Sequence, residues 1–449
     1  MAKILTGFVA ICVVLMNFHL GKNNVNAADD KYMQAYSRLV SALEDTIDWN
    51  ETLKQLPGFD CYQARPLHLP PLGRELTFSC DALPPSDEIP TSAHRIRPAD
   101  IRVIGAMGDS LTAANGAGAC FLPELLYMYR GLTFSHGGDE SFETNPTLAN
   151  ILRKYNPDLK GYGVNTGMWY SDDSSMNVGH PGDIAADMPN QARWLVSKMK
   201  ADPQIDYEND WKIITLFIGG NDLCDWCDNN EYYSPENYVK HIHEGLMILH
   251  DEMPRTIVNV IGTIRVSEVE VLRAPICDIF QWAFCPCALF LTPDERENFD
   301  NLTKAYQEAL EESITNGQYD DKEDFTVVLQ PFLHESAVPY TESGDPDFSY
   351  FAPDCFHLSA KGHAQGGLEL WKNMIEPVGG KATTWSPDKI NLTCPSSEFP
   401  YIFTNVNSRP QFWEPTQPAT TSKSSSPIGA GVLSMITVAL ATKLLATRH

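Results

Sequence analysis

A serine and a histidine–aspartate pair stand far apart in the sequence, each in a context that suits nucleophilic catalysis. Ser110 lies in the tetrapeptide Gly-Asp-Ser-Leu, directly after the apolar run Ile101–Met107, and Asp354 precedes His357 by three residues. A serine is a weak nucleophile until a base takes its proton, and histidine is the side chain best suited to that task near neutral pH. An aspartate three residues before it can hold its second ring nitrogen. We therefore predict a triad of Ser110, His357 and Asp354.

Three donors are candidates for an oxyanion hole, which acyl transfer to a serine also needs. They are the backbone N–H groups of Ser110 and Gly182 and the side-chain amide of Asn221, which follows two glycines after the apolar run Trp211–Ile218. One such donor contributes on the order of 3 kcal/mol to the transition state. Glycine and asparagine also suit ordinary turns. The prediction therefore depends on all of these residues occurring together at the ends of predicted strands.

Other interpretations of the same residues stay open. Asp354 and His357 would also suit a loop ion pair or a helix cap, and His363, on the following predicted helix, is a competing base. We favour His357 because its spacing from Asp354 allows the two side chains to orient each other within one loop. His180 and the segment Met168–Tyr170 either contact a substrate or are ordinary loop residues.

The elements around these residues predict a doubly wound α/β fold with a parallel sheet. Apolar β-branched runs predict strands, and helical periodicity predicts the segments between them. The strands are expected at 101–107, 161–164, 211–218, 256–261 and 325–329, and the helices at 122–130, 147–155, 187–200, 235–253, 292–315 (capped by Thr292) and 360–375 (capped by Ser359). Ser110 and Asn221 then fall beyond the carboxyl ends of strands, where sites form in such sheets. Thr112 stands where an α/β-hydrolase elbow needs glycine, which disfavours that fold.

The ends of the chain have the composition of a secretory-pathway protein. Residues 1–27 combine Lys3, an apolar run and small residues, as in a cleavable signal peptide. Residues 28–98 are expected to form a packing helix at 32–47 and a proline-rich arm that wraps the catalytic domain. We expect the domain itself at 99–395, a Pro/Ser/Thr-rich linker at 396–427 and an apolar tail at 428–449. The tail fits either a GPI signal or a transmembrane helix. The expected location is the cell surface or the extracellular space.

Cysteines and glycosylation acceptors agree with export. Of the 11 cysteines, removal of the leader takes away Cys12 and leaves ten, an even number that favours disulfides over metal ligation. We expect Cys61 to pair with Cys80, and we leave the partners of the remaining cysteines open. Cys224 and Cys227 would also suit a redox pair or half a zinc site, but no second such spacing occurs. The glycosylation acceptors are Asn50, Asn301 and Asn391.

The net charge excludes some partners. At a formal −25 at pH 7, the chain is unsuited to nucleic acid and to strong adsorption on anionic lipid surfaces. A neutral or zwitterionic substrate is compatible with this charge. The apolar segment Ile279–Leu291, which contains Cys285 and Cys287, either contacts lipid, lines an acyl pocket or packs in the core.

The chain resembles the GDSL or SGNH hydrolase superfamily and, within it, the phospholipase B1 lineage. Ser110, Gly182 and Asn221 match the serine, glycine and asparagine of its first three blocks, and Asp354 with His357 matches the final D-x-x-H. The narrower match rests on residues 95–101, 187–192, 217–227 and 285–287, and the whole resemblance spans about 57–380. It implies a flavodoxin-like α/β fold with about five parallel strands between helices.

The resemblance implies a serine esterase that cleaves acyl esters of phospholipids, lysophospholipids or glycerides with no metal or cofactor. Its expected partners are a lipid substrate and a membrane surface reached through the tail. A first alternative is an esterase of the same fold that acts on another ester, such as an acetylated glycan. A second is a catalytically silent surface-binding protein that keeps the fold.

Overall fold

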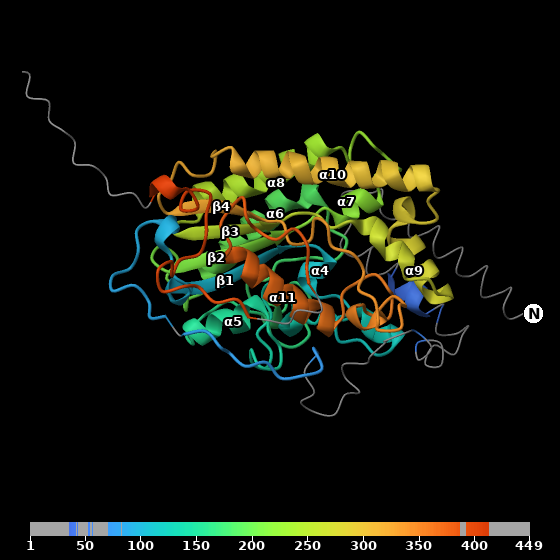
Figure 1. The fold of residues 1–449 in the computed structure, drawn as a ribbon, viewed down its shortest axis with the longest axis horizontal. Coiled ribbons are helices and arrows are strands. Elements are labelled where there is room, and N and C mark those ends of the chain that lie inside the picture. Colours follow the sequence, from blue (N-terminus) through green and yellow to red (C-terminus); the bar gives the residue numbers. More distant parts are fainter. Residues whose placement is uncertain are drawn as a thin grey trace, which may run out of the picture. The chain divides into compact units, whose positions relative to one another are not determined.

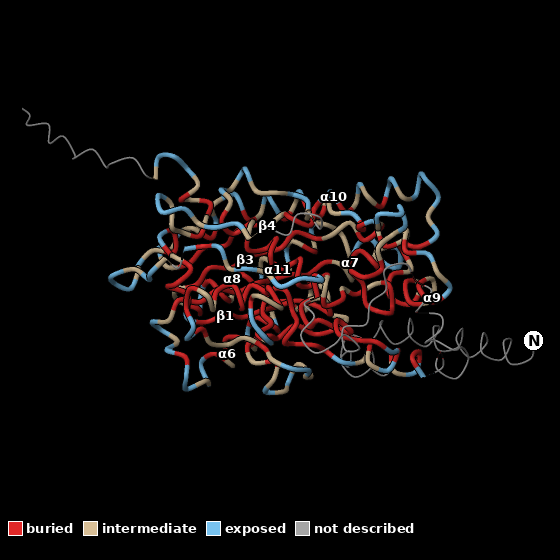
Figure 2. The backbone as a smooth tube through the Cα atoms, turned by 60° about the horizontal axis from the view of Figure 1, so that its bottom comes forward, coloured by how far each residue is buried: buried red, intermediate tan, exposed pale blue. Residues whose placement is uncertain are grey.

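The structure is a computed structural model, and it describes residues 36–41, 43, 53, 56, 71–81, 83–386 and 392–412. Its centre is a parallel sheet in the order β1-β2-β3-β4. The strands are β1 (Ile101–Gly108), β2 (Trp211–Phe217), β3 (Thr256–Ile261) and β4 (Phe325–Gln330). Almost every residue of the four strands is buried, as Figure 2 shows by the red tubes at the centre of the molecule. Continuous apolar runs of this kind are typical of parallel strands that are covered on both faces.

The predicted α/β fold class is confirmed, but the fifth strand is not a regular one. The segment expected at 161–164 forms no strand. Instead, Lys160 and the stretch 176–180 bond in turn to the outer edge of β1: Ile104 N donates to Lys160 O at 3.0 Å, Ala106 N to Met176 O at 3.0 Å, and His180 N to Gly108 O at 3.0 Å. An irregular segment therefore takes the fifth position and leads directly to Gly182.

Helices cover both faces of the sheet (Figure 1). One face packs against α6 (Met188–Ala201), α8 (Pro235–Glu252) and α10 (Pro293–Thr315), and the other against α5 (Leu148–Tyr155) and α11 (Ala360–Met374). The N-caps expected for α10 and α11 are present. Thr292 forms a capping box with Glu295 at the start of α10, and Ser359 Oγ accepts from Gly362 N at the start of α11. Three further helices are α4 (Ser110–Ala113), α7 (Gly220–Cys224) and α9 (Pro275–Phe284).

The prediction of a helix at 122–130 is wrong. That segment forms two short 3-10 turns, Leu122–Leu126 and Arg130–Leu132. Between them, Tyr127 O accepts from Gly116 N at 2.9 Å and Tyr129 N donates to Ala114 O at 3.0 Å. These backbone groups are used in pairing with the loop after α4, so they are not free for a continuous helix.

The disulfides differ from the expected Cys61–Cys80 pair, because Cys80 is bonded to Cys394. The arm and the segment near 393 meet beside α11, where Trp371 Nε1 donates to Thr393 O at 2.7 Å. A contact between segments 314 residues apart cannot be read from cysteine spacing. Within the described ranges, disulfides also join Cys224 to Cys285, Cys227 to Cys287 and Cys277 to Cys355. The expected pairing partner Cys61 lies outside the described residues.

The segment expected to begin a linker at residue 396 is packed on the catalytic unit as far as Phe412. Ile402 N donates to Ile96 O at 2.9 Å, and Phe403 N donates to Met374 O at 3.0 Å. The compact unit ends at Phe412. The predicted leader at 1–27, the acceptors Asn50 and Asn391 and the tail at 428–449 lie outside the described residues, and Asn301 is exposed on α10. Within the described ranges, no helix is long and apolar enough to cross a membrane.

Candidate active site

Ser110 is presented by a tight turn at the end of β1. Gly108 has φ +148°, and a Cβ built there would lie 2.2 Å from Phe217 O, so only glycine fits. The amide of Gln191 holds both the N–H and the C=O of Gly108 at 2.8 Å. Asp109 then caps α4 through a 2.9 Å bond from Leu111 N to its carboxylate. The turn therefore fixes Ser110 at the first residue of α4.

The structure brings the three predicted triad residues into one hydrogen-bonded chain. Ser110 Oγ lies 2.8 Å from His357 Nε2, and His357 Nδ1 lies 2.7 Å from Asp354 Oδ2. All three side chains are buried, with Asp354 completely so. The other carboxylate oxygen of Asp354 accepts from the backbone N–H groups of Phe356 and His357, both at 3.0 Å. This geometry suits removal of the serine proton by the imidazole.

The carboxylate of Asp354 is stabilised in its ionised form. Burial by itself would raise the pKa of Asp354, but the charge of His357 and the hydrogen bonds from His357 and Phe356 outweigh burial and hold that pKa below its usual range. Asp354 is therefore negatively charged near neutral pH. A charged partner of this kind orients the ring and favours the imidazolium form of His357.

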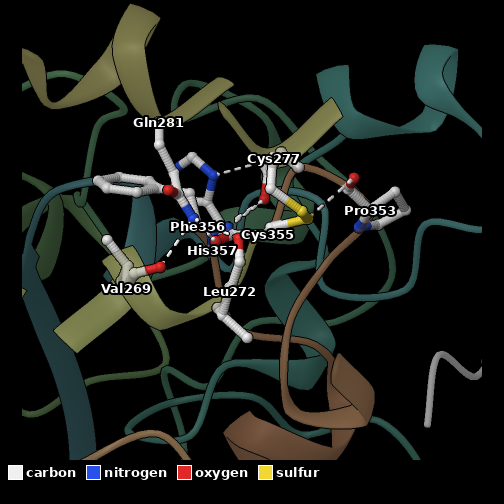
Figure 3. Close-up of a disulfide and its surroundings, with 9 residues drawn as sticks. Val269, Leu272, Cys277, Gln281, Pro353, Cys355, Phe356 and His357 are labelled. Carbon is white, nitrogen blue, oxygen red and sulfur yellow. Dashed lines mark hydrogen bonds and ion pairs between the residues drawn. A yellow bond between two sulfur atoms is a disulfide. The ribbon is translucent and has the colours of Figure 1, made fainter. Parts of the chain in front are cut away.

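Helix α9 fixes the loop that carries Asp354 and His357, as Figure 3 shows. The disulfide Cys277–Cys355 joins the first turn of α9 to this loop, and Gln281 Nε2 donates to Cys355 O at 3.3 Å. Cys355 has φ +55°, a backbone conformation that is uncommon for a residue with a side chain. These two tethers maintain that conformation between Asp354 and His357.

The same region also fixes the helix that carries Asn221. Cys285, which ends α9, and Cys287 are bonded to Cys224 and Cys227, at and beyond the end of α7. The sequence left three interpretations open for the apolar segment around these cysteines, and the structure gives mainly core packing. Both ends of the α9 region are therefore covalently attached to site-bearing elements.

Tyr36 contacts the triad, a role that sequence reasoning missed. Its hydroxyl donates to Asp354 Oδ2 at 3.2 Å, and its ring packs edge-on against Phe284, 5.1 Å between centroids. The helical periodicity of this segment indicated packing alone. A buried tyrosine in an otherwise apolar stripe was the available signal, since such hydroxyls usually find a partner.

We predict that Tyr36→Phe lowers kcat about three- to tenfold, which corresponds to about 0.7 to 1.4 kcal/mol. The ring and its packing remain, but Asp354 loses the donor that holds its Oδ2, so the carboxylate is held less firmly against His357 Nδ1. Tyr155→Phe is the matched control, because the buried Tyr155 hydroxyl has no hydrogen-bond partner within the described structure. A kcat in Tyr36→Phe equal to that of the wild-type protein would mean that Tyr36 only packs.

The three predicted oxyanion donors lie on adjoining elements. His180 N bonds Gly108 O, which places the Gly182 turn beside the Ser110 turn. Asn221 Nδ2 donates to Asp183 O at 2.8 Å, which links α7 to the same turn and leaves its second amide hydrogen available. Gly182 has φ +86°, and within the described residues neither its N–H nor that of Ser110 has a recorded hydrogen-bond acceptor. These contacts connect the turns that carry the three predicted donors.

We expect Asn221→Ala to lower kcat by about 10²- to 10³-fold with a smaller change in KM, because an oxyanion donor acts mainly in the transition state. Steady-state kinetics on a soluble ester, with thermal unfolding as the check on folding, measure this effect. A folded variant within threefold of the wild-type kcat would remove Asn221 from the oxyanion hole.

Two buried carboxyl groups lie beside the donors. Burial raises the pKa of Asp109 to about 7 and that of Asp222 to about 7, and backbone hydrogen bonds oppose the shift in each case. Asp222 accepts from Ala185 N at 3.1 Å and so holds the loop that follows Gly182. Near neutral pH both groups carry only part of a negative charge, which limits their repulsion of an oxyanion at Ser110.

The competing histidine is unsuited to act as the base. His363 is completely buried, its ring stacks on Phe134, and Phe134 N donates to its Nδ1 at 3.3 Å. Burial lowers the pKa of His363 to about 3, so it stays neutral. His180 bonds Asp183 Oδ1 at 2.9 Å and packs against Trp169. Within the described ranges, no cluster of three His, Cys, Asp or Glu side chains could hold a metal ion.

Comparison with known proteins agrees with this geometry. The sequence model of the family described as GDSL-like Lipase/Acylhydrolase matches residues 104–369. The human protein named Phospholipase B1, membrane-associated is 47% identical over 338 residues, which cover 73% of this chain and 23% of that protein. The rat protein of the same name is 45% identical over 361 residues, covering 77% and 25%. This chain thus spans about a quarter of the length of these relatives.

An extracellular lipase of Streptomyces rimosus, solved by crystallography, aligns with 60% of this chain and 97% of its own, at 12% identity and a TM-score of 0.30. That similarity is too low to support any statement about the site. The family match covers more than half of the chain, and it contains Ser110, Gly182, Asn221, Asp354 and His357. The chain is similar to the membrane-associated phospholipases B1 and belongs to the GDSL-like lipase/acylhydrolase family of carboxylic ester hydrolases.

Proposed function

We propose that this chain hydrolyses acyl ester bonds of phospholipids and lysophospholipids. The observation that carries the chemistry is the hydrogen-bonded chain from Ser110 through His357 to Asp354, with 2.8 and 2.7 Å between the bonded atoms. The lipid substrate is supported by the names of the relatives, although this chain covers only a quarter of their length. The formal net charge of −25 at pH 7 favours a zwitterionic lipid over an anionic one as the substrate.

The mechanism follows from the geometry of the triad. Ser110 Oγ attacks the ester carbonyl while His357 Nε2 takes its proton, and Asp354 holds the ring and stabilises its positive charge. The N–H groups of Ser110 and Gly182 and the amide of Asn221 bind the oxyanion. His357 then gives the proton to the departing alcohol, and the acyl group remains bound to Ser110 as an acyl-serine. A water molecule deprotonated by the same histidine attacks the acyl-serine and releases the fatty acid.

The test combines covalent labelling with a release assay on the folded protein. A fluorophosphonate probe, followed by mass mapping, should label Ser110, and phosphatidylcholine and lysophosphatidylcholine should both release fatty acid. Labelling without release from either lipid would contradict the phospholipid substrate and favour another ester. Absence of labelling in folded protein would contradict the enzyme proposal and favour a surface-binding protein.

A comparison of acyl chains separates the lipid substrate from an acetylated one. An acyl-lipid enzyme should gain kcat/KM as the acyl chain of a soluble ester lengthens, because each buried methylene contributes about 0.8 kcal/mol. A higher rate on acetyl esters than on octanoyl esters would instead favour an acetylated glycan or a similar small ester.

We also propose that the protein acts at a membrane surface after passage through the secretory pathway. The names of the relatives support the membrane, and disulfides such as Cys277–Cys355 agree with an oxidising compartment. Phosphatidylinositol-specific phospholipase C should release the protein from cells if the tail is a GPI signal and should leave it bound if the tail is a transmembrane helix. Loss of mass on treatment with N-glycosidase would test the acceptors Asn50, Asn301 and Asn391.

A further inference from the structure

A cavity of about 230 Å³ lies beside the Gly182 turn, and the proposed chemistry does not use it. It is lined by aromatic and acidic side chains, among them Trp169, Trp194, His180, Asp183, Asp187 and Gln191. The cavity is partly open, so a group attached to a larger substrate can enter it. Two tryptophans and two carboxylates therefore surround one small space.

The cavity adjoins the candidate active site through shared residues. The side chain of Asp183 lines it, while the backbone carbonyl of the same residue accepts from Asn221 Nδ2 at 2.8 Å. Gln191 also lines it, and its amide holds Gly108, two residues before Ser110, at 2.8 Å. The cavity therefore shares Asp183 and Gln191 with the elements around Ser110, which makes it a candidate site for the head group of a substrate whose ester lies at Ser110.

The two tryptophans provide a surface that attracts cations. The rings of Trp169 and Trp194 stand nearly perpendicular, at 84° with 4.8 Å between centroids. The ammonium group of Lys198 already lies 5.2 Å from the centre of the Trp194 ring. Aromatic faces bind poorly hydrated cations, with about 0.5 to 2 kcal/mol for each contact. In this edge-to-face contact the edge of one ring lies against a face of the other, so a cation would bind on the ring faces that the contact leaves uncovered.

The two carboxylates of the cavity favour a ligand with a positive charge. Asp183 Oδ2 accepts from Gln191 at 2.7 Å and its Oδ1 lies 2.9 Å from His180 Nδ1, so its charge is held at the wall of the cavity. Asp187 Oδ2 accepts from Ile184 N at 3.0 Å. Two carboxylates in fixed positions disfavour an anionic head group. Because both carboxylate oxygens of Asp183 already have hydrogen-bond partners and the tryptophan walls offer few acceptors, the cavity suits a methylated ammonium better than a primary one.

We propose that this cavity binds the quaternary ammonium group of a choline lipid and so selects the head group of the substrate. The proposal rests on the function proposed above, since it assigns a substrate class to the same site. It makes Trp169 a specificity-determining residue rather than a catalytic one. The expected order of kcat/KM is choline lipid first, ethanolamine lipid second and glycerol lipid last.

The kinetic test uses short-chain lipids that stay monomeric, so that the charge of a vesicle surface does not affect the result. Trp169→Leu should lower kcat/KM about five- to tenfold on dihexanoyl phosphatidylcholine, mainly through KM, and should leave dihexanoyl phosphatidylglycerol and a soluble butyrate ester unchanged. Trp169→Phe should recover part of the loss. Tyr170→Leu is the matched control, because Tyr170 is an exposed ring next to Trp169 that does not line the cavity. Equal losses on both lipids, or no loss on either, would overturn the proposal.

A binding measurement separates this proposal from the proposed function. Saturation-transfer NMR on the wild-type protein should show contact with the methyl groups of phosphocholine and none with glycerol 3-phosphate, and Trp169→Leu should abolish the contact. If the wild-type protein cleaves the butyrate ester but neither lipid, the phospholipase proposal fails while this binding result still decides the cavity. Absence of phosphocholine binding to folded wild-type protein would overturn the cavity proposal even if both lipids are cleaved.

Discussion

Replacement of Ser110 by alanine is expected to lower kcat about 10⁶-fold on every ester that the protein cleaves. The side chain is buried and its oxygen lies 2.8 Å from His357 Nε2, so no other hydroxyl can replace it as the group that this histidine activates. The oxyanion donors remain in the variant, because the N–H of residue 110 is a backbone group. The residual rate should therefore still exceed the rate in water.

The measurement is single-turnover and steady-state hydrolysis of a soluble ester, with thermal unfolding to show that the variant is folded. Loss of one buried hydroxyl at a helix start should change the unfolding free energy by about 1 kcal/mol. Ser135→Ala is a matched control, because Ser135 is also buried and its hydroxyl has no partner among the described residues. Turnover near the wild-type rate in folded Ser110→Ala would show that Ser110 is not the nucleophile.

The parts of the fold that were predictable from sequence are those set by local patterns. The runs that became β1, β2, β3 and β4 are short, mostly apolar and rich in β-branched residues, as is typical of strands covered on both faces. The predicted triad was readable for a similar reason, since Asp354 and His357 lie in one short loop and Ser110 follows a strand. The structure then places these residues within hydrogen-bonding distance.

The features that the sequence did not reveal depend on contacts between distant segments. Cys80 pairs with Cys394 because the arm crosses to the far end of the chain, and an even count of cysteines carries no information on that path. The edge of β1 is paired by an irregular segment, which has no period of two to detect. Tyr36 reaches Asp354 across 318 residues, so its periodicity could show only that it is buried. Burial predicts packing, but it does not identify a hydrogen-bond partner.

The role of the α9 region also depends on contacts with distant segments, so the sequence left it open. A stretch as apolar as Ile279–Leu291 suits lipid contact and core equally well by composition. The structure shows that Cys285 and Cys287 attach it to Cys224 and Cys227, and that Cys277, two residues before the stretch, is bonded to Cys355. The α9 region therefore positions the two segments that carry His357 and Asn221. Composition alone does not distinguish this structural role from lipid contact.

Replacement of Asp354 by asparagine is expected to lower kcat about 10⁴-fold while the serine and the histidine remain in place. An asparagine can present its NH₂ group to His357 Nδ1 and so favour the wrong tautomer, and it cannot stabilise the imidazolium by charge. The carboxylate accepts four hydrogen bonds in the native protein, from Tyr36, Phe356 and His357 (backbone and ring). The single amide oxygen of an asparagine cannot accept all four hydrogen bonds, so some loss of stability should accompany the loss of rate.

The rate of fluorophosphonate labelling separates a catalytic effect from unfolding, because labelling also requires activation of Ser110. In folded Asp354→Asn the labelling rate should fall in parallel with kcat. Asp345→Asn, an exposed aspartate of the preceding loop, is the matched control and should change neither. The low pKa of Asp354 means that its own protonation should not appear in the wild-type pH–rate profile near neutral pH. A folded Asp354→Asn that keeps a tenth of the wild-type kcat would exclude a charged partner for His357, and the Ser110–His357 pair would then have to act without it.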